Sequence, residues 1–103
     1  MTDGSLIELV QQLERYISPL LGAGPANPLS KEENKILALQ QLTRLNQKIG
    51  IIARTNKEEM EKMKTLQTFV NSITVGVKSD NVTQMKYGLT QAKNLISSFS
   101  YER

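Results

Sequence analysis

A long apolar stripe runs through the middle of the sequence. From Ala38 onward, steps of four and three residues reach twelve positions, and ten of them are apolar. These positions are Ala38, Leu42, Leu45, Ile49, Ile52, Asn56, Glu59, Met63, Leu66, Val70, Ile73 and Val77. This spacing puts the side chains on one face of an α-helix, where they pack as knobs into the holes of another helix. The stripe therefore predicts a helical protein in which a second helical surface covers this region.

Two helix-start signals occur within the middle region. Ser30 and Glu33 have the spacing of a capping box, in which a serine hydroxyl and a glutamate carboxylate satisfy free N–H groups of the first turn. Thr55 and Glu58 form a second capping box, five residues after Gly50. The first box predicts that a helix begins at residue 30, and the second suggests that another begins at residue 55.

The region 30–77 is therefore open to two arrangements. In one, the chain breaks near residue 54 and residues on either side form a helical hairpin. In the other, a single helix of about 72 Å spans the region, and Asn56 is a polar residue in a coiled-coil seam. The second capping box and the glycine favour the break, whereas the unbroken phase of the stripe favours the straight helix.

Helical spacing continues on both sides of this region. The N-terminal stripe is Leu6, Val10, Leu13 and Ile17, broadened by Ile7, Leu9 and Tyr16, and the C-terminal stripe is Val82, Met85, Leu89, Ala92, Ile96 and Phe99. We expect helices over about 4–18 and 80–99. Pro19 should end the first helix near Ser18, and Ser79 or Asp80 should cap the last one. All three prolines lie in residues 18–29, which we expect to form the connector.

These segments together predict the fold class. A chain of 103 residues has the length of one ordinary domain. We expect residues 1–103 to form a single all-α domain, a three- or four-helix antiparallel bundle with a long, coiled-coil-like middle region.

The composition removes many chemistries. The sequence contains no cysteine and no histidine, so disulfides, Cys or Ser–His nucleophiles and the usual zinc, haem and iron–sulfur ligands are absent. We expect no enzyme activity, no cofactor, no metal site and no catalytic residues. No apolar run reaches the ~20 residues that cross a bilayer, and the amphipathic first segment is unlike a signal peptide. A cytoplasmic location is the default expectation.

Charge is divided unevenly along the chain. Residues 1–34 carry a net charge of −3 and residues 35–103 a net charge of +6. In a helix, Arg54, Lys57 and Lys64 would share one face and could contact successive phosphates of a nucleic acid. Because three glutamates lie among these cations and no aromatic residue does, a solvated helix face explains the pattern more simply. Nucleic-acid binding through this basic face is therefore the alternative function.

The leading expectation is a non-enzymatic helical interaction module. A straight middle region would expose more apolar surface than the terminal helices can cover, so it would self-associate as a homo-oligomer or join a larger protein assembly as a small subunit. The expected protein interface consists of Leu42, Leu45, Ile49, Ile52 and Met63.

Overall fold

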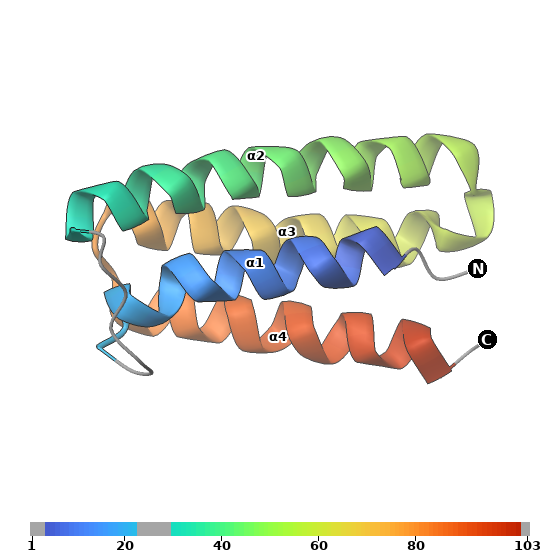
Figure 1. The fold of residues 1–103 in the computed structure, drawn as a ribbon. Coiled ribbons are helices and arrows are strands. Elements are labelled where there is room, and N and C mark those ends of the chain that lie inside the picture. Colours follow the sequence, from blue (N-terminus) through green and yellow to red (C-terminus); the bar gives the residue numbers. More distant parts are fainter. Residues whose placement is uncertain (1–3, 23–29, 102–103) are drawn as a thin grey trace.

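The computed structural model describes residues 4–22 and 30–101 and shows an all-α bundle. It contains α1 (Gly4–Leu20), α2 (Lys31–Thr55), a short 3₁₀ helix η1 (Lys57–Glu59), α3 (Met60–Lys78) and α4 (Val82–Tyr101). The helices run alternately up and down, and each packs against its neighbours in the sequence (Figure 1). The predicted antiparallel bundle is confirmed, with four long helices and no strand in the described part of the chain.

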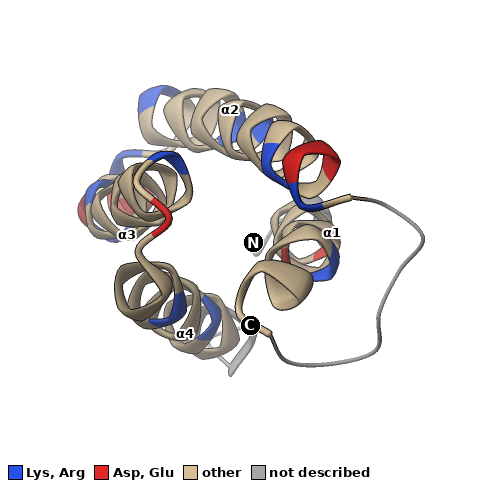
Figure 2. Cartoon of the chain, turned by 90° about the vertical axis from the view of Figure 1, so that its left-hand side faces the viewer, with Lys and Arg blue, Asp and Glu red and all other residues tan. Residues whose placement is uncertain are grey.

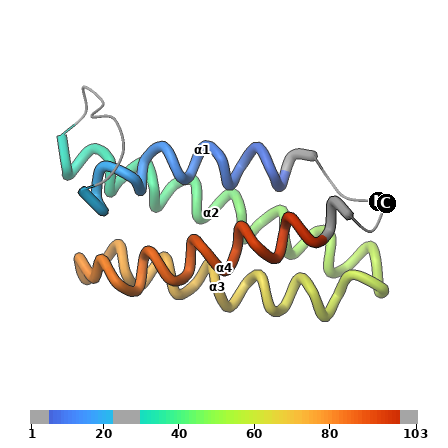
Figure 3. The backbone as a smooth tube through the Cα atoms, turned by 90° about the horizontal axis from the view of Figure 1, so that it is seen from below, coloured from blue at the N-terminus to red at the C-terminus, as the bar shows by residue number. Residues whose placement is uncertain are grey.

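Viewed along their axes, the four helices occupy the corners of a square (Figure 2). α1 and α4 are also neighbours and close the bundle, although they touch less extensively than the other adjacent pairs. The start of α1 and the end of α4 therefore lie at the same end of a bundle about 40 Å long (Figure 3). The turn between α2 and α3 is at this end as well.

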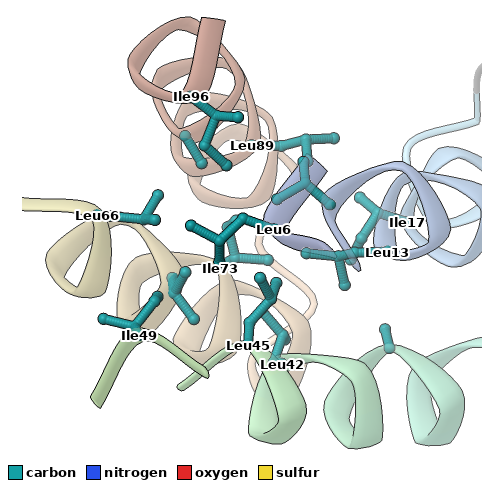
Figure 4. Close-up of a cluster of buried hydrophobic side chains, with 14 of the residues drawn as sticks. Leu6, Leu13, Ile17, Leu42, Leu45, Ile49, Leu66, Ile73, Leu89 and Ile96 are labelled. Atoms are coloured by element: carbon teal, nitrogen blue, oxygen red, sulfur yellow. The ribbon is translucent and has the colours of Figure 1, made fainter. Parts of the chain in front are cut away.

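The apolar stripes of all four helices meet in one core. Labelled leucines and isoleucines from every helix point toward one another in its interior (Figure 4). Residues almost fully shielded from solvent include Leu6, Leu13, Ile17, Leu42, Leu45, Ile49, Met63, Leu66, Ile73, Val77 and Met85. The helical spacing of the sequence thus corresponds to the faces that the helices turn inward, apart from Val82 at the start of α4, which is exposed.

The middle region is broken, so the straight-helix arrangement is wrong. α2 ends at Thr55, and Asn56 adopts an extended backbone with φ −138° and ψ 98°. The side-chain oxygen of Asn56 accepts a hydrogen bond from the N–H of Glu58 at 3.1 Å and so caps η1. The capping role expected of Thr55 is also wrong, because its hydroxyl donates back to the Ile51 carbonyl within α2.

The start of α2 matches its prediction in detail. The Ser30 hydroxyl accepts a hydrogen bond from the N–H of Glu33, and the Glu33 carboxylate accepts one from the N–H of Ser30. Hydrogen bonding of the Glu33 carboxylate to the Ser30 backbone N–H, and to a smaller extent to the Ser30 side chain, holds the pKa of the Glu33 carboxyl below its ordinary value of 4.5. The capping box is therefore formed on both sides.

The turn between α3 and α4 depends on Asp80. Its φ of 56° lies in the left-handed region, and the N–H of Asn81 donates to the Gly76 carbonyl at 2.8 Å, as in a Schellman motif. Asn81 then caps α4, because its side-chain oxygen accepts from the N–H of Gln84. The expectation that Ser79 or Asp80 caps this helix was wrong, since the turn uses both residues to end α3.

The first helix is longer than expected. α1 extends to Leu20, although Pro19 was expected to end it near Ser18. A proline in the last turn removes one backbone hydrogen bond and crowds the carbonyl one turn earlier, but its fixed φ is compatible with a helix. The N–H of Leu21 still donates to the Ile17 carbonyl at 3.1 Å. Most of the predicted connector, residues 23–29, lies outside the described residues.

Candidate functional site

The expected interface residues lie mainly inside the bundle. Leu42, Leu45, Ile49 and Met63 are each at most 1% exposed, and Ile52 is partly buried against the same core. These residues are buried because the break at Asn56 folds α3 back onto α2, so that one half of the stripe covers the other. The expectation that they form an interface with a partner is therefore wrong for the closed bundle. A partner protein cannot reach the four buried residues while the bundle is closed.

A hollow of about 200 Å³ lies between α1 and α4. We call it the α1–α4 hollow. Val10 and Ile96, each about 5% exposed or less, provide its apolar base, and Ile7 adds a partly buried side chain. The rest of its lining is polar and consists of Gln11, Glu14, Lys93 and Ser97. The hollow therefore combines an apolar base with hydrogen-bonding groups around it.

An ion pair crosses the α1–α4 hollow. The ammonium of Lys93 lies 2.7 Å from the carboxylate of Glu14, and both side chains are partly exposed. Because water screens such a pair, it contributes only about 0.2–1 kcal/mol to folding. The seam between α1 and α4 is thus closed by an exposed pair over a shallow apolar base.

A second hollow, of about 370 Å³, lies on the other side of α1, against α2. We call it the α1–α2 hollow. Its lining residues are Glu8, Leu9, Gln12, Tyr16, Gln41 and Arg44. The Gln12 amide donates to the Tyr16 hydroxyl at 2.8 Å, and the buried Gln41 amide donates to the Leu9 carbonyl at 3.1 Å. These bonds hold the side chains of Gln12, Tyr16 and Gln41 in place at the hollow.

The two hollows make α1 the best candidate for a binding element. Its exposed residues Glu8, Gln11 and Arg15 form a ridge, with one hollow on each side of it. The sequence interpretation passed over this surface because it placed the interface on the middle stripe. The available signal was the broadened stripe of α1, since Ile7 and Leu9 lie outside the narrow face that one neighbouring helix would cover.

The three predicted phosphate contacts are exposed in the structure. Arg54 lies in the last turn of α2, Lys57 begins η1 and Lys64 lies in the second turn of α3, so all three are close to the turn at Asn56. The Lys64 ammonium is 4.0 Å from the Glu61 carboxylate. Across the molecule, basic residues are distributed over all four helices rather than gathered on one (Figure 2).

Among residues 4–22 and 30–101, no three His, Cys, Asp or Glu side chains gather into a group that could hold a metal ion. None of the described helices has the length and apolar character needed to cross a membrane. Comparison with family models, curated proteins and solved structures finds no match to this chain.

Proposed function

We propose that the protein is a non-enzymatic interaction module, a small subunit that binds another protein through the α1 face. We define the α1 face as the ridge of Glu8, Gln11 and Arg15 with the hollow on either side of it. The observation that carries the proposal is the pair of hollows flanking one helix. The proposal assigns no catalytic residue and no cofactor.

The shape and chemistry of the α1–α4 hollow favour an amphipathic helix as the bound element. Its volume of about 200 Å³ is below the roughly 300–1,000 Å³ of sites that enclose small molecules, yet it has room for an aliphatic side chain. An apolar base within a polar rim is the usual arrangement of a protein interface. A helix lying between α1 and α4 would insert one apolar anchor there, in the helix-in-groove mode.

Charge on the α1 face gives the partner helix a second property. α1 carries Glu8 and Glu14 against Arg15, whereas the other three long helices each have a net positive charge. A partner with lysine or arginine beside its apolar anchor would meet favourable charge at Glu8 and Glu14, whereas Lys93 and Arg44 in the linings of the hollows are positive. The expected partner segment is therefore a basic amphipathic helix.

Site-specific photo-crosslinking in the native cell tests this proposal. A photoreactive amino acid replaces Gln11 on the ridge or Ser97 at the rim of the α1–α4 hollow, and the matched control replaces Thr43 on the outer side of α2. All three positions are exposed, so the replacements should preserve the fold. We expect the Gln11 and Ser97 probes to label one partner, and peptide mapping to place the adduct on a basic amphipathic helix.

Two further results decide the outcome. The substitution Gln11→Glu makes the ridge more negative and should increase the affinity for the partner helix. Gln11→Arg should lower that affinity several-fold, which corresponds to about 1 kcal/mol or more. Equal labelling from Thr43 and Gln11, or an adduct on an acidic or non-helical segment, would contradict the proposal.

The second candidate function is nucleic-acid binding through Arg54, Lys57 and Lys64. It is supported by the exposure of all three side chains near one turn of the bundle. Binding of RNA or DNA should then weaken steeply with salt, and replacing the three residues with glutamine should reduce the salt slope by about three. A salt-independent signal, or one unchanged by these substitutions, would exclude this candidate.

The cytoplasmic location expected from the sequence stays a prediction. A fluorescent fusion of the full chain, imaged in the native cell, tests it directly.

A further inference from the structure

The four–three spacing of the middle stripe continues without interruption across the turn between α2 and α3, although a turn does not require this. Positions from Ala38 to Val77 follow one heptad register, although α2 and α3 are separate antiparallel helices. Two helices joined by a turn have no requirement for a common register, because each contributes its own face to the core. A shared register is required only when the same residues lie on one face of a continuous helix.

The break between α2 and α3 is small. The α-helical hydrogen bond from the Asn56 N–H to the Ile52 carbonyl is present at 2.9 Å, and one residue, Asn56, has extended dihedral angles before η1 begins. Returning Asn56 to helical angles and η1 to α-helical pitch would join α2 and α3 into one helix of about 72 Å.

Straightening opens two seams of the closed bundle. When α2 and α3 straighten, the hairpins α1–α2 and α3–α4 separate, so the extensive packing of α2 on α3 and the contacts between α1 and α4 are both lost within the chain. The α1–α4 seam is the least extensive of the bundle, and its ion pair is exposed. The apolar faces of the two hairpins must then be covered again, and the residues with the matching shape are those of a second copy.

We propose that two copies of this chain form a dimer by exchanging hairpins, with Asn56 as the hinge. The α1–α2 hairpin of each copy packs on the α3–α4 hairpin of the other, so the α2–α3 and α1–α4 contacts of the closed bundle form again between chains, while the contacts within each hairpin are kept. The two straight helices cross near Asn56, which brings Ile52 and Glu59 of both copies to the crossing. This inference does not depend on the α1 face or its partner.

Two opposed variants at the hinge test the exchange. Lys57→Pro should hold the chain closed, because proline suits the first position after a cap, favours an extended preceding residue and would clash inside a continuous helix. The double substitution Asn56→Leu with Glu59→Leu should favour the open form, because it completes the apolar stripe and removes the Asn56 cap. Because each dimer opens two hinges, loss of the cap alone corresponds to a roughly thirtyfold tighter dimer.

The two measured quantities are the molar mass of the particle and the distance between two labels on either side of the hinge. Each protein is refolded over a range from micromolar to millimolar concentration and examined by size-exclusion chromatography with light scattering. The sequence has no cysteine, so Thr43→Cys with Thr68→Cys allows clean spin labelling of two exposed positions. In an excess of unlabelled protein, the label distance should rise from roughly one interhelical spacing, about 10 Å, to about 37 Å along one straight helix.

The expected order of dimer formation is the double leucine variant, then the natural sequence, then Lys57→Pro, which stays monomeric. If the double leucine variant does not fold, the natural sequence and Lys57→Pro still give the decisive comparison. A natural sequence that stays monomeric at millimolar concentration, or a dimer with the short label distance, would overturn the proposal. The short distance would mean that two closed bundles associate side by side.

Discussion

The two hairpins of the bundle differ in how closely their helices approach. In α3–α4, a Cβ added to Gly88 would lie 2.7 Å from Ile73, and one added to Gly76 would lie 2.9 Å from Met85. The backbones are therefore close, and neither site has room for a methyl group. In α1–α2, a glutamine bridges the helices, and the α1–α2 hollow remains beside it.

Under the proposed function, this difference separates the tightly packed part of the molecule from the part that would contact a partner. A seam filled by backbone and aliphatic side chains leaves nothing for a partner to occupy, whereas the seams on either side of α1 retain concave, partly polar surface. The α3–α4 hairpin thus resembles a rigid support. The α1–α2 hairpin presents the surfaces that a partner could contact.

The largest expected effect comes from truncating the tight seam. Ile73→Ala should lower the free energy of unfolding by about 2–5 kcal/mol, because Ile73 is fully buried beneath Gly88. Ile7→Ala, at the α1–α4 hollow, should cost clearly less, because its side chain is partly exposed. Urea denaturation of both variants measures the difference. Equal losses would show that the two regions are packed alike.

The second largest difference in stability is expected when a glycine of each hairpin is replaced by alanine. Gly88→Ala should destabilise the protein by about 1–3 kcal/mol through overpacking against Ile73. Gly50→Ala is the matched control in α2, where an added Cβ meets no atom within 4 Å, and it should stabilise the protein by about 0.5–1 kcal/mol. The comparison fails if thermal denaturation shows both substitutions to be stabilising.

The ion pair across the α1–α4 seam should have a small effect. Lys93→Gln should lower stability by about 0.2–1 kcal/mol at low salt and by less at high salt, because solvent screens the pair with Glu14. Lys86→Gln, an exposed site on the same helix, is the control. A Lys93→Gln effect that persists unchanged at high salt would indicate that the pair is more protected than its exposure suggests.

The smallest expected effect is a difference in acid sensitivity between the N-terminal cap of α2 and that of α4. Because folding lowers the Glu33 pKa below 4.5, its stabilising contribution is complete above that pH and is lost as the pH falls through the folded-state value. The cap of α4 uses Asn81, which does not titrate. Hydrogen exchange should show residues 31–35 losing protection in acid before residues 82–86, and Glu33→Gln should remove this difference.

Sequence reasoning found the elements better than it found the surface. The Ser30–Glu33 box is local, so its residues and spacing specify it fully, and the structure forms it as predicted. The roles of Asn56 and Asp80 were harder to assign, because the neighbouring residues Thr55, Ser79 and Asn81 are equally good capping residues when only the sequence is considered. Their roles depend on where the preceding helix ends, which packing against the other helices decides.

The hollows beside α1 could not be predicted from the sequence, because their position also depends on how the helices pack together. An apolar stripe shows that a residue will be covered but does not identify the surface that covers it. Leu42 and Met63 were therefore assigned to a partner, although α2 and α3 bury them against the rest of the chain. The hollows beside α1 arise from the spacing of three helices, and no short stretch of sequence contains that information.

The order of residues alone determined that this protein is helical, where its inward faces lie and how α2 begins, because periodicity and capping act over one or a few turns. The tertiary structure decided that the middle stripe folds back on itself, that glycines bring α3 and α4 close, and that concave surface remains along α1. Those outcomes depend on distances between helices far apart in the sequence, and such distances are fixed only when all four pack together.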